Sequence, residues 1–154
     1  MTAPLEALRA TLRTEMPVTQ HLGIEAVGYH NGVLSLRAPL AANVNHKGTA
    51  FGGSLNAIAT LAGWGVIWLA LREHDIPGEV VIQDSSVHYL RPVRGDFVAR
   101  SGPPEPEALS RLLGAVRRRG RGRIGLVAEV EDSEGAAVRF AGRYVVQAPI
   151  RPPG

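Results

Sequence analysis

The chain has 154 residues, of which 45% are hydrophobic and 20% are charged, and its formal net charge is +3. This composition excludes a disordered chain, so we expect one globular domain over residues 1–154 with its core at about 17–148. There is no cysteine, which excludes disulfides, thiolate metal sites and cysteine nucleophiles. Charged side chains at Glu6, Arg9 and Arg13 interrupt the apolar start, unlike a signal peptide, so we expect a cytoplasmic protein.

The first part of the chain predicts a short helix followed by a hairpin. Leucines at positions 5, 8 and 12 have helical spacing, which predicts a short surface helix over residues 4–15. Residues 22–29 and 33–38 have the pattern of strands, and Asn31-Gly32 between them is typical of a β-hairpin turn. Residues 41–53 are polar and rich in glycine, which predicts a loop.

One long apolar helix is predicted at residues 54–72. It has no charged residue between Ser54 and Arg72, and its length approaches the roughly 20 residues that cross a bilayer. However, Asn56 and Thr60 lower its hydrophobicity, and the strands that follow need a core to pack against. We therefore expect a buried helix and no membrane partner. Small residues would let a sheet or a second subunit approach its backbone: Ala57, Ala59, Ala62, Gly63 and Gly65.

Four further strands are predicted after this helix, at residues 80–90, 96–101, 123–131 and 136–148, with a short helix at 107–119. A hairpin, a buried helix and then four strands is the order of elements in the hot-dog fold. The expected fold class is therefore α+β, with a long central helix wrapped by a curved antiparallel sheet of about six strands. In this fold the first strand after the helix pairs across a two-fold axis, so we expect a homodimer or a dimer of dimers.

Six short stretches carry a family resemblance: residues 43–55, 61–65, 84–92, 95–96, 122–123 and 142–144. They resemble the thioesterase domain that is fused behind acetyltransferase domains in some bacterial proteins. The resemblance extends from about residue 17 to residue 144. It implies the hot-dog fold and hydrolysis of acyl thioesters, with acyl-CoA or an acyl-carrier protein as the substrate.

The Gly52-Gly53 pair before the helix is the first candidate site. Glycines at a loop-to-helix junction leave backbone N–H groups uncovered, and the helix dipole adds partial positive charge there. Gly53, with Gly52, is therefore predicted to hold the thioester carbonyl oxygen as negative charge develops on it. The alternative is that the glycines only permit a tight start of the helix, with Ser54 as its cap. Phe51 and Ser54 are predicted to flank the bound substrate.

The group that activates water is harder to assign. In thioesterases of the phenylacetate-pathway group a helix carboxylate has this role, and the resemblance places Thr60 there, which could only position water. Asp84 resembles the aspartate that orients water in medium-chain acyl-CoA thioesterases. A carboxylate in an apolar strand is costly to bury unless paired or used, so Asp84 is predicted as the catalytic group, with Ser85 beside the substrate. The alternative is that Asp84 anchors an arginine, Arg91 or Arg94, across the interface.

Asn45 and His46 lie in the loop before the glycines. The Asn45 amide is predicted to hold the carbonyl or the water, and the alternative is that it ties down its own loop. His46 is predicted to meet the thioester or the pantetheine arm, with an exposed loop position as the alternative. His88 shares a strand face with Asp84 but lies roughly 13 Å away, so it is expected to be structural. No metal and no cofactor are expected, because no histidine has metal-ligand spacing with carboxylates.

The densest charge lies in the arginine-rich run at residues 117–123. Arginines make bidentate contacts with phosphates, so Arg121 and Arg123 are predicted to hold the phosphates of CoA, with a solvated loop as the alternative. Nucleic acid is not expected as a partner, because the run has no interleaved aromatic residues for base stacking.

Two function classes remain open. The first is a thioester hydrolase in which Asn45, Gly52 and Gly53 of one subunit face the partner subunit's Asp84. The second is a non-catalytic acyl-CoA binder or ligand sensor built on the same fold.

Overall fold

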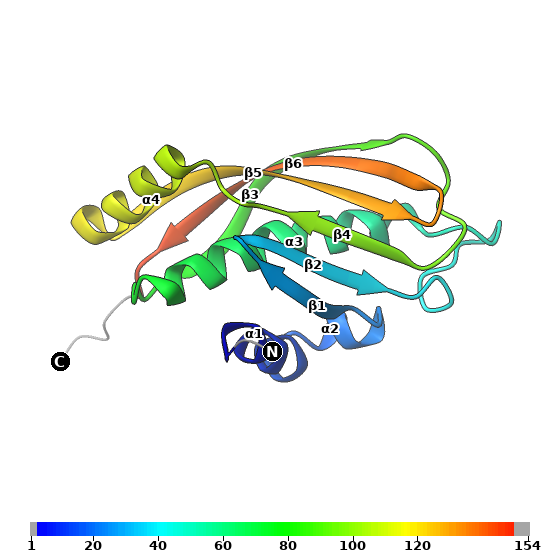
Figure 1. Ribbon diagram of the computed structural model, residues 1–154, viewed down its shortest axis with the longest axis horizontal. Coiled ribbons are helices and arrows are strands. Elements are labelled where there is room, and N and C mark those ends of the chain that lie inside the picture. The colour runs from blue at the N-terminus through cyan, green and yellow to red at the C-terminus, as the bar shows by residue number, and fades with distance from the viewer. Residues whose placement is uncertain (1–2, 150–154) are drawn as a thin grey trace.

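The computed structural model describes residues 3–149, so residues 1–2 and 150–154 of the predicted domain lie outside the described part. Six strands form one antiparallel sheet in the order β1-β2-β4-β5-β6-β3, which curls around the long helix α3 (Figure 1). This arrangement confirms the predicted α+β class. The elements in chain order are α1 (Ala3–Glu15), α2 (Pro17–His21), β1 (Glu25–His30), β2 (Val33–Ala38), α3 (Gly52–Glu73), β3 (Glu79–Tyr89), β4 (Phe97–Ser101), α4 (Pro106–Arg119), β5 (Arg121–Asp132) and β6 (Gly135–Gln147).

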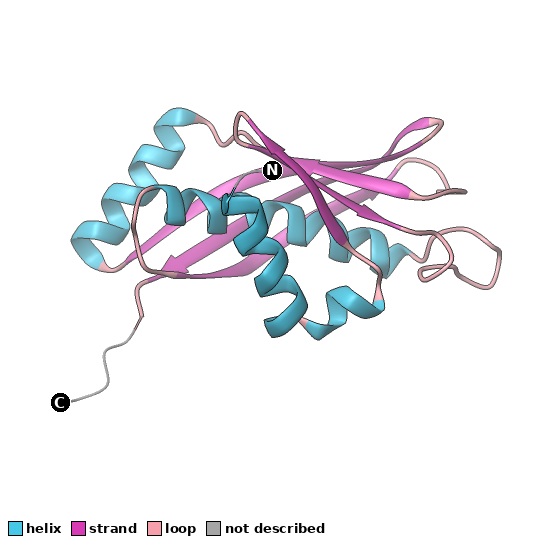
Figure 2. Cartoon of the chain, turned by 60° about the horizontal axis from the view of Figure 1, so that its bottom comes forward, coloured by secondary structure: helices cyan, strands magenta, loops and turns pink. Residues whose placement is uncertain are grey.

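The N-terminal part has the predicted helix and hairpin. In α1, Leu5, Leu8 and Leu12 are buried, as their spacing indicated. β1 and β2 pair around Asn31 and Gly32, whose φ angles of 53° and 78° fit a tight turn that asparagine and glycine tolerate. The short helix α2 was not predicted, because five residues are too few to show a helical period. α1 packs against α3 and β1, so the N-terminal helices and α3 lie on one side of the sheet (Figure 2).

Helix α3 begins at Gly52, two residues before its predicted start. Its N-cap residue is Phe51, and no side chain caps it. The alternative in which Ser54 caps the helix is therefore wrong, and Ser54 is instead buried in the first turn. By length and composition α3 could cross a bilayer, but 72% of its most apolar segment is buried inside the fold. Such burial is typical of the core helix of a globular domain.

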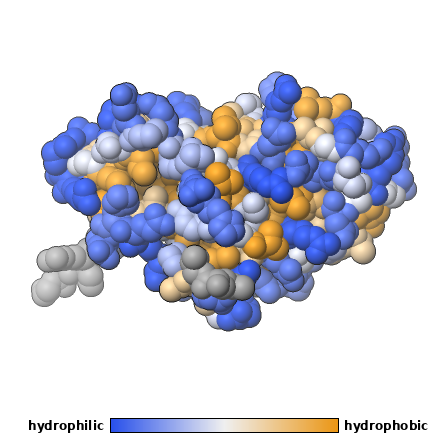
Figure 3. Space-filling view, viewed as in Figure 1, coloured by the Kyte–Doolittle hydropathy of each residue, from blue (hydrophilic) through white to orange (hydrophobic). Residues whose placement is uncertain are grey.

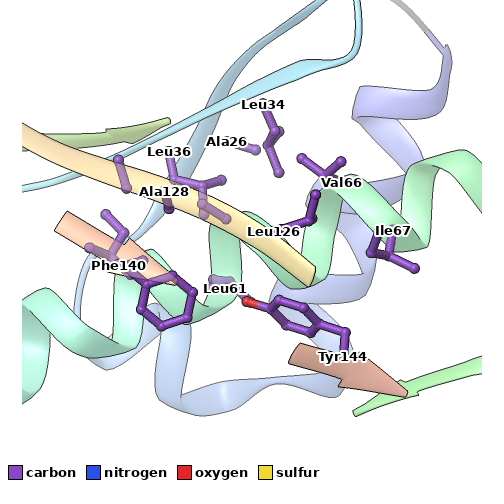
Figure 4. Packing of buried hydrophobic residues seen from close by; sticks show 14 of the residues in the cluster. Ala26, Leu34, Leu36, Leu61, Val66, Ile67, Leu126, Ala128, Phe140 and Tyr144 are labelled. Carbon is purple, nitrogen blue, oxygen red and sulfur yellow. The ribbon is translucent and has the colours of Figure 1, made fainter. Parts of the chain in front are cut away.

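Two glycines of α3 allow the sheet to approach the helix backbone, as the sequence predicted. A Cβ at Gly63 would overlap the hydroxyl of Tyr144 in β6, and a Cβ at Gly65 would overlap the side chain of Leu34 in β2. Tyr144 is fully buried among the hydrophobic residues of the core (Figure 4). Its hydroxyl donates a 2.7 Å hydrogen bond to the backbone carbonyl of Thr60. Burial raises the pKa of this hydroxyl well above its usual value, so it remains a neutral donor. The middle of α3 is thereby fixed to the sheet.

β3 is an edge strand that bonds to β6 on one side only. Most of its 11 residues are exposed, including the apolar Val81 (58%) and Tyr89 (52%). A β-bulge interrupts its pairing with β6 between Ile82 and Asp84. Long apolar edges are uncommon on the surface of monomeric proteins, because their unpaired N–H and C=O groups invite another strand.

An ion pair holds the end of β3 against the turn between β5 and β6. Two guanidinium nitrogens of Arg91 donate to the carboxylate of Asp132, whose side chain is almost fully buried. This hydrogen bonding lowers the pKa of Asp132 to about 2. Near the same end of β3, the Tyr89 hydroxyl donates to the carbonyl of Gly52 at 3.0 Å. The C-terminal end of β3 therefore lies beside the start of α3.

We predict that Gly63→Ala destabilises the fold, although alanine is favoured over glycine inside helices by about 1 kcal/mol. The added Cβ would overlap the Tyr144 hydroxyl, and such overpacking costs about 1–3 kcal/mol. Urea denaturation would measure the free energy of unfolding. As a control, the same substitution in a Tyr144→Phe background should cost less, because the hydroxyl is absent. Equal costs in both backgrounds would contradict the proposed contact.

Candidate active site

The start of α3 offers two free backbone donors. The N–H groups of Ser54 and Leu55 both donate to the carbonyl of Phe51, at 3.0 and 3.2 Å. Within residues 3–149, no acceptor receives the N–H groups of Gly52 and Gly53. These two groups stand at the positive end of a 22-residue helix dipole, which favours negative charge. The start of α3 therefore offers two hydrogen-bond donors that an anionic or carbonyl oxygen could accept from.

A buried asparagine fixes the loop that precedes this helix. The Nδ2 of Asn43 donates to the backbone carbonyls of Leu22 and Pro39, both at 2.8 Å. Its own backbone carbonyl accepts the N–H of Phe51 at 2.7 Å. Asn43 thus positions the residue just before the two glycines. The role of Asn43 was not predicted, because a loop asparagine has no sequence pattern that marks it as buried.

Asn45 ties down its own loop, which is the alternative that the sequence left open. Its Oδ1 accepts the N–H groups of Lys47 and Thr49, at 2.8 and 3.1 Å, and its Nδ2 donates to the Thr49 hydroxyl at 2.8 Å. One Nδ2 hydrogen remains for a ligand. His46 is exposed in the same loop, a position that fits its alternative as a surface residue.

An apolar groove of about 380 Å³, which we call the α3 groove, runs along α3 from Gly53 to Trp64. At a rise of about 1.5 Å per residue, these positions are roughly 16 Å apart. Trp64 is held in place because its Nε1 donates to the Val80 carbonyl at 2.8 Å and its ring stacks on Trp68. The lining residues are Met16, Val18, Thr19, Leu22, Ile24, Gly53, Asn56, Ala57, Thr60, Leu61, Trp64, Ile82 and Tyr144.

Two polar side chains interact in this groove. The hydroxyl of Thr60 donates to the Oδ1 of Asn56, one helical turn away, at 3.3 Å. Among the described residues none accepts a hydrogen bond from the Nδ2 of Asn56, so this amide keeps its donors for a ligand. From the sequence, Asn56 was interpreted only as a residue that lowers the hydrophobicity of the helix. Its spacing of three residues from Gly53 and four from Thr60 was the signal that the three share one helix face.

Asp84 lies on the opposite face of the sheet from the α3 groove. In β6, Gly142 and Tyr144 are buried, whereas Arg143 between them is exposed and is the strand partner of Asp84. The Nε of Arg143 donates to Asp84 at 2.7 Å, and a second guanidinium nitrogen donates to the other carboxylate oxygen. This hydrogen bonding lowers the pKa of Asp84. Asp84 thus anchors an arginine, which was the alternative to a catalytic role. The arginine is Arg143 of its own chain, and not Arg91 or Arg94 across an interface.

The bulge in β3 accounts for the position of Asp84. Ile82 lines the α3 groove, and regular alternation would place Asp84 on the same face. The bulge between these two residues adds one residue to the strand, so Asp84 turns to the outer face. Ser85, its neighbour, is paired with the buried Gly142 and faces α3, but it does not line the groove. Within one chain the structure therefore does not bring Asp84 to Gly53, and the predicted approach of the partner subunit's Asp84 stays a prediction.

Arg121 and Arg123 lie at the other end of the sheet from the start of α3. The strand register places Arg121 level with Glu79, the first residue of β3, whereas Tyr89 at the last position contacts Gly52. Ten residues of strand separate these two levels, which is roughly 33 Å. Within one chain the arginines are thus remote from the α3 groove. Over residues 3–149, no cluster of three or more histidine, aspartate or glutamate residues forms a candidate metal site.

Comparison with known proteins identifies the family. A family described as "Putative thioesterase (yiiD_Cterm)" matches residues 5–148, nearly the whole chain. The chain belongs to this thioesterase family. The family assignment agrees with the resemblance seen in the sequence, and it supports thioester hydrolysis as the general activity.

Solved structures share the fold of this thioesterase-family chain. A protein of unknown function from Chlorobaculum tepidum is 31% identical, with a TM-score of 0.89 over 96% of this chain and 100% of that chain. The "putative thioesterase" from Shewanella oneidensis is 30% identical, with a TM-score of 0.85 over 97% and 100%. A thioesterase from Haemophilus influenzae is 21% identical, with a TM-score of 0.76 over 98% and 95%. These similarities confirm the predicted hot-dog fold.

We expect Asp84→Asn to leave thioester turnover close to that of the wild type, because Asp84 faces away from the α3 groove and is held by Arg143. Steady-state kinetics would measure turnover, and sedimentation would show whether assembly is intact. Thr60→Val, which removes a hydroxyl inside the groove, is the matched variant and should slow turnover. A loss of about a hundredfold in Asp84→Asn, with assembly intact, would support its predicted catalytic role instead.

Proposed function

We propose that this protein hydrolyses acyl thioesters of CoA or of an acyl-carrier protein, in a homodimer with one α3 groove per chain. The observation that carries the proposal is that the groove joins an apolar channel to the free backbone N–H of Gly53, next to that of Gly52 in the chain. An acyl thioester has the matching parts. Its carbonyl oxygen accepts hydrogen bonds, and its hydrocarbon chain gains free energy on burial.

The N–H groups of Gly52 and Gly53 are the proposed oxyanion site. When water attacks the carbonyl carbon, a C–O bond forms and the carbonyl oxygen takes up negative charge, which these donors stabilise. Collapse of the intermediate breaks the C–S bond, and one proton of the attacking water passes to the leaving sulfur, which gives the carboxylic acid and the thiol. A single donor of this kind typically contributes about 100- to 1000-fold to the rate.

Asn56 and Thr60 are the proposed holders of the attacking water. They follow Gly53 on the same helix face, and their hydrogen bond leaves the Asn56 amide with free donors. Asn45, which keeps one amide hydrogen in the loop before α3, is a further proposed contact to the carbonyl or the water. These groups orient water but contain no base, so the thioester must be activated mainly by the backbone donors.

A non-catalytic acyl-CoA binder is the second candidate function, and one observation favours it. None of the residues that line the α3 groove is an aspartate, a glutamate or a histidine. The groove therefore offers no side chain that accepts a proton from water near neutral pH. A binder would use the same channel and the same donors without turnover.

The homodimer is proposed from the free edge of β3. Pairing two such edges across a two-fold axis would satisfy their unpaired backbone groups and cover exposed apolar side chains such as Val81. Ile82 of the same strand lines the α3 groove, so the partner chain would lie close to the groove on that side. The interface and the two sites would then be formed together.

The experiment that tests this function is a thiol-release assay across acyl-CoA and acyl-carrier-protein thioesters of increasing chain length. We expect turnover by the wild type, and a loss of about a hundredfold in Gly53→Val, whose side chain would crowd the carbonyl position and the Phe51 ring. The matched control is Gly95→Val, where an added Cβ meets nothing within 4 Å. Binding of acyl-CoA without turnover by the wild type would favour the binder.

Trp64 is expected to limit the length of the acyl chain, because it lies at the far end of the groove from Gly53. We predict that Trp64→Leu shifts the preferred substrate to longer chains. Each further methylene that is buried contributes about 0.8 kcal/mol, which is roughly fourfold in kcat/KM. The ratio of kcat/KM between long and short acyl-CoA would measure the shift. An unchanged ratio would show that the chain does not follow α3.

A further inference from the structure

Two exposed aromatic rings flank the free backbone donors at the start of α3. The chain has three phenylalanines, three tyrosines and two tryptophans. All of them lie within residues 3–149, and the ones that are exposed there are Phe51 (58%) and Tyr89 (52%). Figure 3 shows hydrophobic surface between hydrophilic residues at the end of the molecule where α3 begins, on the right of the view. Exposure of aromatic rings in this chain is thus confined to two residues.

Each of these rings lies against one of the two glycines. A Cβ at Gly53 would overlap the edge of the Phe51 ring, and a Cβ at Gly52 would lie 3.6 Å from the ring of Tyr89. The hydrogen bond from the Tyr89 hydroxyl to the Gly52 carbonyl holds the second ring in place. The two rings therefore stand beside the N–H groups that are proposed to bind the carbonyl oxygen.

Phenylalanine is an unusual residue at the position that precedes a helix. Serine, threonine, aspartate and asparagine are preferred there, because their side-chain oxygens accept an N–H of the first turn. Phe51 has no such oxygen, so the donors of the first turn stay free. Its own backbone is fixed, since its N–H donates to the Asn43 carbonyl and its carbonyl accepts the N–H of Ser54. The Phe51 ring is thus held beside free donors without being buried by its own chain, which suits contact with a ligand.

The direction of the groove determines where the sulfur of a bound thioester lies. In the proposed complex the carbonyl oxygen accepts from the backbone donors, and the acyl chain follows the α3 groove from Gly53 towards Trp64. The third substituent of the carbonyl carbon is the sulfur, which must leave on the side away from the groove. Neither Phe51 nor Tyr89 lines the groove, and both contact the glycines, so the two rings stand on that side.

We propose that Phe51 and Tyr89 contact the sulfur of the bound thioester and select thioesters over oxygen esters. The inference rests on the proposed function and adds a basis for discrimination between two classes of ester. Sulfur is polarisable and makes favourable contacts with the edges of aromatic rings at about 5 Å. An ester oxygen in the same place is smaller and polar, and its loss of water is not compensated by a hydrocarbon ring. The ring edge is also the positive part of the aromatic quadrupole, which favours the charge that sulfur gains as the C–S bond breaks.

A contact between subunits does not account for both rings. Tyr89 ends the edge strand β3, so pairing of two such edges could cover it. Phe51 lies in the loop before α3 and belongs to no strand. If the rings served assembly alone, removing them would lower the sedimentation mass and leave the selectivity between esters unchanged. That result would overturn the inference.

The test compares a thioester of pantetheine with the matched oxygen ester, in which oxygen replaces the sulfur and the acyl chain is the same. Release of the common carboxylic acid measures kcat/KM for both, and their difference in intrinsic reactivity cancels between variants. For Phe51→Leu and for Tyr89→Leu we expect the thioester-to-oxygen-ester ratio of kcat/KM to fall about two- to tenfold, because leucine has no ring. An unchanged ratio in the double variant, with its fold intact by melting temperature, would overturn the inference.

Matched variants separate the ring from other properties of these side chains. Phe51→Tyr keeps the ring and should keep the ratio. Tyr89→Phe keeps the ring but removes the hydrogen bond to Gly52, and it should also keep the ratio. Val127→Ala, which shortens an exposed apolar side chain of β5 that does not line the groove, is the control for lost apolar surface. If the ratio falls in Tyr89→Phe as far as in Tyr89→Leu, selectivity belongs to the hydroxyl and the contact of Tyr89 with sulfur is wrong.

Calorimetry separates a failure of this inference from a failure of the proposed hydrolysis. If the wild type binds both esters and hydrolyses neither, the proposed hydrolysis is wrong, and the ratio of the two Kd values becomes the readout. The double variant Phe51→Leu/Tyr89→Leu should then lose affinity for the thioester by a similar factor and keep its affinity for the oxygen ester. Equal losses for both esters would show that the rings contact the carrier arm or the acyl chain and not the sulfur.

Discussion

The contact between Tyr144 and the middle of α3 is the constraint on which the rest of this structure depends. A helix without a polar face must be buried on almost every side, and Gly63 lets the tyrosine reach its backbone. Because the hydroxyl is bonded to the Thr60 carbonyl, the rotation of the helix about its own axis is fixed. The stripe that the sheet leaves open, from Gly53 through Thr60 to Trp64, becomes a wall of the groove. The packing that stabilises the fold therefore also determines which face of α3 lines the groove.

Most elements were predictable because each has a local signal of its own. The Asn31-Gly32 turn, the apolar run of α3 and the alternating strands β5 and β6 depend only on neighbouring residues. The start of α3 was predicted two residues late, since Gly52 and Gly53 are typical of a loop, although they lie in the first turn. Where the local preference of a segment for helix or strand agrees with its tertiary packing, the sequence alone is enough to predict the element. The helix α2 begins at Pro17 and is too short to be recognised by its period.

The site was less predictable, because its geometry depends on irregular pairing. Alternation assigns strand faces only when pairing is regular, and no local pattern marks the bulge that turns Asp84 outward. Asn56 shows the opposite case. Its helical spacing from Gly53 and Thr60 was visible in the sequence. A single polar residue on an apolar helix, however, usually has no functional role. The backbone donors of Gly53 were predictable, because free N–H groups at a helix start follow from the chain itself.

In the proposed homodimer, the free edge of β3 would link the stability of this protein to its abundance. A fold whose longer edge strand bonds to a second copy gains part of its free energy of unfolding from association. By mass action, each tenfold dilution of such a dimer removes about 1.4 kcal/mol from that free energy. A cell that produces this chain at a low concentration would therefore contain a larger unfolded fraction of it than a cell that produces it at a high concentration. Expression level would act here as a thermodynamic variable.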